Sequence, residues 1–142
     1  MKPRFLVLAL AGAAWASTAA AAPPPKASPA AASSPATLVY YFHATTRCAT
    51  CRTIEAYAHE TVASRFAADL EARRLEWRAV NVDEPANRHF IRDFRLYTRS
   101  VVVVDAKDPK RFKILDRVWQ LVRNKPAFQA YVEQAIRSFP RS

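Results

Sequence analysis

Cys48 and Cys51 are the only cysteines in the 142-residue chain, and the sequence around them limits the folds that it can adopt. They follow the run Thr37–His43 (TLVYYFH), whose β-branched and aromatic residues predict a buried strand. A helix is predicted to begin at Cys48 or at the next residue and to extend to about Arg73, because apolar residues recur every four positions along this segment. The thiol pair is therefore expected at a strand–loop–helix junction, directly after the short loop 44–47.

The remainder of the chain predicts three more strands and two more helices. These are a strand over 75–82, a short helix over 85–94 that begins at Pro85, a strand over 101–104, a turn over 106–110, an edge strand over 111–115 and a helix over 124–139. The resulting order, βαβαββα, predicts an α/β domain with a four-stranded mixed sheet and helices on both faces. The helical connections predict parallel first strands, whereas the short turn predicts an antiparallel last pair.

The segment before this domain has a different composition. Residues 1–21 have the features of a secretory signal peptide, with basic residues, an apolar run over 5–16 and small residues up to a cleavage position after Ala21. The apolar run is shorter than the roughly 20 residues that a spanning helix needs, and an uncleaved anchor is the alternative. Residues 22–36 are rich in Ala, Pro and Ser and predict a disordered tether. We therefore expect a periplasmic or secreted protein with a folded domain over 37–142 and no transmembrane segment after signal removal.

The formal net charge of +10 reflects 22 Lys and Arg against 12 Asp and Glu. Removal of the signal leaves 20 basic and 12 acidic residues. This excess suggests acidic partners or anionic surfaces, although a solvated basic surface is the simpler interpretation. The basic residues are scattered along the chain, so we do not expect nucleic acid as a partner. The single glycine excludes a G-x-G-x-x-G loop, so no flavin or nicotinamide cofactor is expected in this chain.

The C-A-T-C sequence at 48–51 is the most specific chemical signal. A sulfur at a helix start meets free N–H groups and the positive end of the helix dipole, and Arg47 and Arg52 add positive charge. Both effects lower the pKa of a thiol and favour the thiolate, so Cys48 is the candidate nucleophile and Cys51 the candidate resolving cysteine. A cross-link over so short a loop constrains the unfolded chain little, which favours a reactive role over a structural one.

Two other interpretations of the thiol pair stay open. His43 ends the first predicted strand, so Cys48, Cys51 and His43 form a conceivable site for a soft metal or an arsenical. The domain is also a candidate adaptor, in which the surface docks a partner and the thiols are secondary or inert.

The segment VYYFHATTRCATCRTIE resembles the strand–loop–helix of the thioredoxin superfamily, and NVDEP resembles the end of its next strand. More narrowly, YYFHATTRCATCRTIEAY together with LYTRSVVVVD resembles a small bacterial family of nitrophenyl-compound nitroreductase subunits, the ArsF family. The resemblance covers most of 37–142 and implies a thioredoxin-like three-layer fold and an exported thiol–disulfide oxidoreductase or redox relay. It further implies a protein partner, such as a membrane or periplasmic reductase, that exchanges reducing equivalents with the disulfide and holds any other cofactor.

Two departures from the thioredoxin pattern affect this site. Thioredoxins typically carry a cis-proline before the strand predicted at 101–104, and this chain has Thr98-Arg99-Ser100 there, for which we expect trans peptide bonds. Thr98 and Arg99 are expected to line the site, with Arg99 either a cation beside the thiolate or a solvent-exposed loop residue. The familiar tryptophan before the first cysteine is Arg47 here. Ordinary thioredoxin substrate handling is therefore in doubt.

The buried acid of thioredoxins also has no counterpart, since the first predicted strand carries Tyr40, Tyr41 and Phe42. We expect these side chains to pack in the core, and lining of the thiol site is the alternative. Proton transfer from Cys51 then requires water or His43. The other notable side chains are expected to be structural, with Glu55 paired to Arg52 or His59, Trp77 and Trp119 half-buried in the core, and His59 and His89 on the surface.

Overall fold

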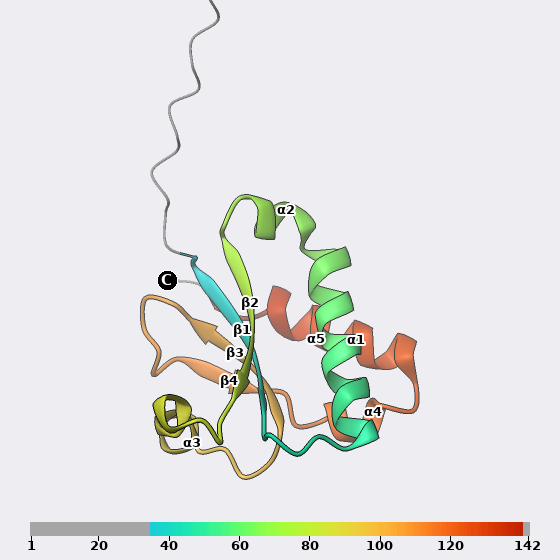
Figure 1. Cartoon of the computed structure of the whole chain (residues 1–142). Coiled ribbons are helices and arrows are strands. Elements are labelled where there is room, and N and C mark those ends of the chain that lie inside the picture. The colour runs from blue at the N-terminus through green and yellow to red at the C-terminus, as the bar shows by residue number, and fades with distance from the viewer. Residues whose placement is uncertain (1–34, 141–142) are drawn as a thin grey trace, which may run out of the picture.

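The helices and strands follow the predicted order along the chain (Figure 1). The structure, a computed structural model, describes residues 35–140, so the predicted signal peptide and nearly all of the predicted tether lie outside the described residues. The elements are β1 (Thr37–His43), α1 (Ala49–Arg65), α2 (Ala67–Glu71), β2 (Leu75–Asn81), the 3₁₀ helix η1 (Pro85–Asn87), α3 (His89–Asp93), β3 (Ser100–Asp105), β4 (Phe112–Ile114), α4 (Val118–Leu121) and α5 (Lys125–Arg137). Within 35–140, no helix combines the length and apolarity needed to cross a membrane.

The strands form one four-stranded mixed sheet in the order β2-β1-β3-β4. The prediction of parallel first strands is confirmed for β1 and β2, in which His43 pairs with Asn81. The same prediction is wrong for the third strand, because β3 is antiparallel to β1. The last pair, β3 and β4, is antiparallel as predicted. The five residues of α3 give about 7.5 Å of helix, too little to return the chain along the roughly 23 Å of a seven-residue strand. The chain therefore enters β3 at the edge of the sheet where β1 and β2 end.

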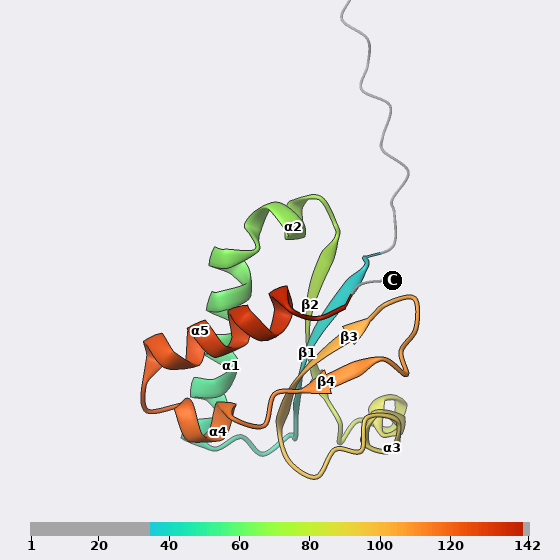
Figure 2. The same ribbon diagram turned by 180° about the vertical axis from the view of Figure 1, so that it is seen from behind.

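Side chains of β1 alternate between two hydrophobic clusters, one on each face of the sheet. Val39 and Tyr41 belong to the larger cluster, which α1 and α5 cover, whereas Tyr40 and Phe42 belong to the smaller cluster beside α3. Figures 1 and 2 show α1, α4 and α5 on one side of the sheet and α3 on the other. The run Val101–Val104 is buried on both faces, as predicted for this strand. The three layers form the predicted thioredoxin-like α/β fold.

The long helix predicted up to Arg73 is interrupted at Phe66. The backbone of Phe66 leaves the helical region (φ −127°, ψ 25°), so α1 ends one residue earlier and α2 begins one residue later. The Phe66 ring is buried, and the Arg137 guanidinium carbon lies 5.0 Å from its centroid. The interruption turns the chain toward β2 while the predicted apolar row stays in the core, with Ile54, Ala58, Val62 and Phe66 all buried.

Three smaller differences concern the ends of elements. The Ala36 N–H donates to Arg74 O at 2.9 Å and its carbonyl accepts from the Ala106 N–H at 3.1 Å, so the folded domain includes this last residue of the predicted tether. The helix predicted over 85–94 is two short helices, η1 and α3, and α4 was not predicted. The half-buried positions of Trp77 and Trp119 and the exposed positions of His59 and His89 are confirmed.

Candidate functional site

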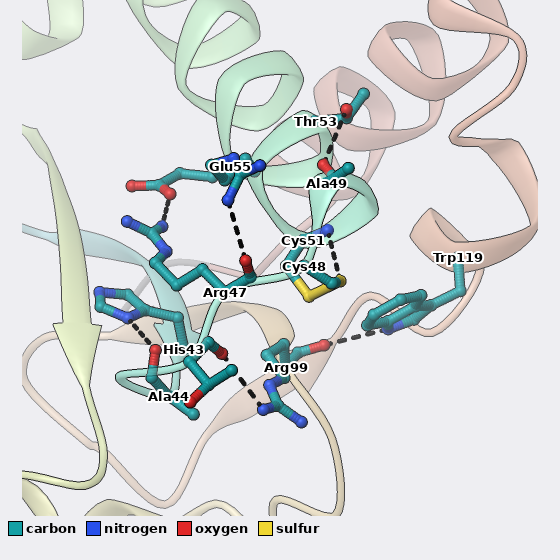
Figure 3. The surroundings of a disulfide bond; sticks show 12 residues. His43, Ala44, Arg47, Cys48, Ala49, Cys51, Thr53, Glu55, Arg99 and Trp119 are labelled. Atoms are coloured by element: carbon teal, nitrogen blue, oxygen red, sulfur yellow. Dashed lines mark hydrogen bonds and ion pairs between the residues drawn. A yellow bond between two sulfur atoms is a disulfide. The ribbon is translucent and has the colours of Figure 1, made fainter.

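The thiol pair lies where the loop after β1 enters α1, and Cys48 and Cys51 form a disulfide with their Cα atoms 5.1 Å apart (Figure 3). Cys48 is the N-cap residue of α1 and is exposed. Cys51 faces inward from the first turn and is only 4% exposed. A molecule that approaches the disulfide from solvent therefore meets the sulfur of Cys48 first.

The Cys48 sulfur occupies the position of a capping acceptor. Its Sγ accepts the N–H of Cys51 at 3.1 Å, and its carbonyl accepts the N–H of Arg52 at 3.1 Å. No acidic residue lies in the first turn of α1. The N–H groups at this end of the helix therefore point toward the sulfur without a competing carboxylate in that turn.

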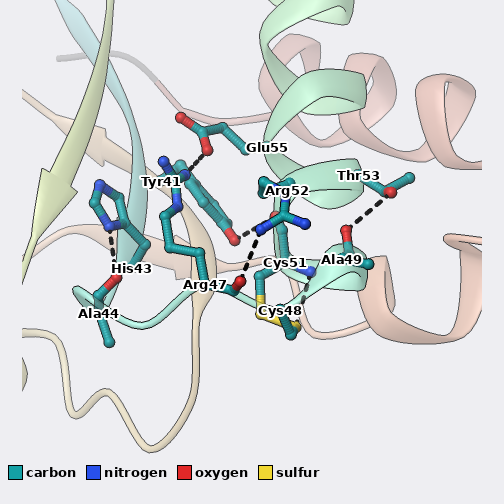
Figure 4. Close-up of polar contacts among 10 residues, drawn as sticks. All are labelled: Tyr41, His43, Ala44, Arg47, Cys48, Ala49, Cys51, Arg52, Thr53 and Glu55. Carbon is teal, nitrogen blue, oxygen red and sulfur yellow. Dashed lines mark hydrogen bonds and ion pairs between the residues drawn. A yellow bond between two sulfur atoms is a disulfide. The ribbon is translucent and has the colours of Figure 1, made fainter.

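The two predicted arginines of the CxxC segment are both engaged with other groups (Figure 4). Arg47 forms an ion pair with Glu55, so the prediction that Glu55 pairs with Arg52 or His59 is wrong. The Arg52 Nη1 donates to the Arg47 carbonyl at 2.9 Å. Since α1 turns every 3.6 residues, Glu55 lies two turns beyond the N-cap and faces back over the preceding loop, where Arg47 lies. The carboxylate of Glu55 therefore offsets much of the positive charge that Arg47 was predicted to bring to the thiols.

Thr98 and Arg99 lie in the loop that precedes β3, and Arg99 contacts the loop that leads into Cys48. The Arg99 Nη2 donates to the Thr46 carbonyl at 3.5 Å, and the Trp119 indole N–H donates to the Arg99 carbonyl at 3.0 Å. The Thr98 carbonyl accepts the Ser100 hydroxyl at 2.9 Å. All peptide bonds in residues 35–140 are trans, as predicted for this loop. Arg99 is therefore a half-buried bridge to the CxxC loop, not a freely solvated side chain.

His43 ends β1 on the side of the sheet that faces α1. Its Nδ1 lies 3.0 Å from the Ala44 carbonyl, and its ring lies 6.1 Å from the ring of Tyr41. Among the described residues, no group of three or more His, Cys, Asp or Glu side chains is arranged to hold a metal ion. The proposed ligand set of His43 with both thiols is thus not assembled around this disulfide.

Tyr41 contacts the Cys48–Cys51 pair through a hydrogen bond that the sequence did not predict. Its hydroxyl donates to the Cys51 carbonyl at 2.7 Å, and the whole side chain is buried. Burial raises the pKa of the Tyr41 phenol, while the positive charges of Arg47 and Arg99 act in the opposite direction. The phenol therefore stays protonated and remains a donor at neutral pH. The alternation of β1, which places Tyr41 on the α1 face, was the available signal. Core packing was the preferred prediction for Tyr41, and a position lining the site was the alternative.

The loop between β1 and the disulfide is held by the end of β2. The Thr45 N–H donates to Asp83 Oδ2 at 2.8 Å, and the Asn81 side-chain amide donates to the Thr45 hydroxyl at 3.0 Å. The Asp83 N–H in turn donates to Asn81 Oδ1 at 3.1 Å. The NVDEP segment therefore positions the CxxC loop. The only sequence signal for this role is that polar residues follow a strand predicted to be parallel to β1.

Comparison of the chain with protein-family models, with curated proteins and with solved structures gave no match in any of the three. The fold and the site together define an α/β domain with a CxxC disulfide at the N-terminus of its longest described helix.

Proposed function

We propose that this protein is an exported thiol–disulfide oxidoreductase or redox relay that uses the Cys48–Cys51 pair. The observation that carries the proposal is the asymmetry of the pair: the sulfur-bearing N-cap residue Cys48 is exposed, and Cys51 behind it is buried. This difference in access assigns attack to the first cysteine and resolution to the second.

The exchange reaction has two balanced steps. In the reduced protein, the Cys48 thiolate attacks one sulfur of a partner disulfide, forms a mixed disulfide and displaces the partner's other sulfur as a thiolate, which takes up a proton from water. Cys51 then loses its proton, attacks the Cys48 sulfur and releases the partner's second thiolate. Two electrons pass to the partner. The same steps in reverse oxidise a partner dithiol, with the disulfide seen here as the reactant.

The environment of Cys48 supports its role as the nucleophile. In the reduced protein, the Cys51 N–H that now donates to the Cys48 sulfur would stabilise a thiolate at that position more strongly than a neutral thiol. The helix dipole acts in the same direction, and the half-buried Arg99 adds a cation on the other side of the loop. Together these groups favour the thiolate form of Cys48 in the reduced protein.

Thioredoxin superfamily membership, export and a protein partner belong to the same proposal. The fold class and the resemblance of VYYFHATTRCATCRTIE support membership, and the basic, apolar and small residues of 1–21 support export. The narrower ArsF-family resemblance supports a partner reductase in the membrane or periplasm. Any flavin or nicotinamide would then be held by that partner, since this chain has one glycine.

Trapping of a mixed disulfide tests the assignment directly. The reduced wild-type chain and its Cys48→Ser and Cys51→Ser variants are mixed with glutathione disulfide, and adducts are measured by mass spectrometry. We expect the Cys51→Ser variant to accumulate a stable glutathione adduct on Cys48. The Cys48→Ser variant should react far more slowly, because its remaining thiol is 4% exposed. The wild-type chain should return to the intramolecular disulfide without a lasting adduct.

Equal and slow reaction of both single-cysteine variants would refute the exchange proposal. Two further readouts address the alternatives. Stoichiometric retention of Cu(I) or arsenite by reduced wild type, lost in Cys48→Ser and unaccompanied by exchange, would favour the binding module. Intact cellular function in a variant without either thiol would favour the adaptor.

A further inference from the structure

A cavity of about 250 Å³ opens at the edge of the sheet where β1 and β2 end. One of its lining residues, Arg99, contacts the Thr46 carbonyl in the loop that precedes Cys48. Its walls come from three places: the end of β1 with the residues that follow β2, the exposed side of α3, and the loop that leads into β3. This volume is below the roughly 300–1,000 Å³ typical of sites for drug-sized ligands and cofactors. The cavity therefore suits one large side chain of another protein better than a free cofactor.

The wall on the side of α3 and the following loop is apolar and open to solvent. Ile91 is 41% exposed and Tyr97 is 78% exposed, and these are the large apolar side chains exposed in the described residues. Both line the cavity, together with the half-buried Leu96. The Tyr97 hydroxyl donates to Asp116 at 3.2 Å, which holds the exposed ring in place. Exposed apolar groups gathered around a hollow are typical of a surface that another molecule covers.

Arg99 connects this cavity to the disulfide. It lines the cavity, and its Nη2 donates to the Thr46 carbonyl two residues before Cys48. Its guanidinium forms no ion pair with a carboxylate of residues 35–140, and its Nε is buried without a hydrogen-bond partner there. The cavity's own carboxylate, Asp83, is already engaged with the Thr45 N–H. A carboxylate from a bound partner would thus complete the charge pairing of Arg99 next to the loop that leads into Cys48.

We propose that the cavity binds an apolar side chain of an extended segment of the redox partner, and that a carboxylate near the partner's reacting cysteine pairs with Arg99. The inference rests on the proposed exchange function and specifies its substrate class: a cysteine within an apolar and acidic segment. The excess of 20 basic over 12 acidic residues after signal removal supports the same preference, because it attracts acidic partners over a longer range.

The test uses short peptides whose single cysteine is joined by a disulfide to thionitrobenzoate, a coloured leaving group. Four peptides combine leucine or serine with glutamate or lysine at positions flanking the cysteine. The reduced chain attacks the peptide sulfur and releases the coloured thiolate, so the rate constant of each reaction is read directly. At low salt, we expect wild type to react about fivefold faster with the glutamate peptides than with the lysine peptides, the size of one or two exposed ion pairs.

Protein variants then locate the source of the preference. Arg99→Gln should abolish the preference for glutamate and Arg99→Glu should reverse it, whereas the matched control Arg73→Glu should keep it. Arg73 is exposed in the turn before β2, at the opposite end of the sheet. Ile91→Ser should reduce the leucine-to-serine rate ratio, expected to be at least about tenfold in wild type for one buried apolar side chain. Each comparison is a ratio of two peptide rates for one protein, so a general change in thiol reactivity cancels.

Equal rates for all four peptides with wild type, or an Arg99→Glu variant that keeps the wild-type preference, would overturn this inference. Continued release of thionitrobenzoate in those experiments would leave the exchange function standing. Failure of reduced wild type to release thionitrobenzoate from any peptide would instead remove the exchange function, and this inference with it.

Discussion

The hydroxyl of Tyr41 connects the first strand to the first turn of α1, and its removal in Tyr41→Phe tests whether that contact holds the site together. The substitution keeps the ring in the core and deletes only a 2.7 Å hydrogen bond to the Cys51 carbonyl. A hydrogen bond of this kind contributes about 0.5–1.5 kcal/mol net, and its short length and full burial place it near the upper end of that range. The Cys51 carbonyl lies in a helix and keeps its intrahelical partner, so the larger penalty of an orphaned acceptor does not apply.

We therefore expect Tyr41→Phe to lower the free energy of unfolding by about 1–1.5 kcal/mol. For a domain of this size, such a loss corresponds to a melting temperature lower by about 4–12 °C. The assay is guanidinium unfolding of the oxidised protein, followed by tryptophan fluorescence at pH 7. Tyr97→Phe is the matched control, because it deletes a hydroxyl whose partner is the exposed Asp116 and whose ring is 78% exposed. This control should show no measurable loss of stability.

The pH dependence of the free energy of unfolding is a second, independent test of the Tyr41 hydrogen bond. Burial raises the pKa of Tyr41 above its ordinary value of about 10, so the folded state holds this proton more tightly than the unfolded state. The resulting stability is fully present below the unfolded pKa and is lost as the pH rises through the folded pKa. The free energy of unfolding of wild type should exceed that of Tyr41→Phe by a constant amount from pH 6 to pH 9. This excess should become smaller above about pH 10. Identical losses in the Tyr41→Phe and Tyr97→Phe variants, or a difference that widens at alkaline pH, would refute the reasoning.

Three further expectations concern the surroundings of the disulfide. Glu55→Gln should release the Arg47 guanidinium, lower the pKa of the Cys48 thiol and increase its alkylation rate by iodoacetamide near neutral pH; a slower reaction would contradict this. Asp83→Ala removes the acceptor of the Thr45 N–H and should accelerate hydrogen exchange of that amide by about fivefold, which NMR can measure. Reduction of the disulfide should cost about 2 kcal/mol of unfolding free energy by the chain-entropy relation, and a loss above about 4 kcal/mol would indicate a structural cross-link.

The sequence was sufficient to predict features that depend on local patterns. The run Thr37–His43 and the four valines from Val101 signal buried strands by composition, and the four-residue apolar recurrence signals the core face of α1. The order of these elements then constrains the topology, because each strand and helix must bury its apolar face against a neighbour. The position of the CxxC pair at the start of a helix follows from the same local reasoning.

The boundaries of the helices and the directions of the strands were harder to predict from the sequence. The interruption at Phe66 and the antiparallel direction of β3 depend on how far each connection carries the chain and on which surface it must reach. A periodic apolar pattern continues across Phe66, since both the ring and the residues before it are buried. Periodicity reports the buried face of a segment but not a change in its direction.

Only the tertiary structure decided the partners of the polar groups at the site. Glu55 pairs with Arg47 across the loop, Tyr41 reaches the Cys51 carbonyl, and Arg99 contacts a carbonyl 53 positions earlier in the sequence. Propensity and periodicity describe neighbours along one element, whereas these contacts depend on sheet register, helix rotation and loop path together. The sequence by itself therefore determined where the two sulfurs lie in the fold. The packing of distant segments determined which of the two sulfurs is exposed to solvent and which charged groups surround the pair.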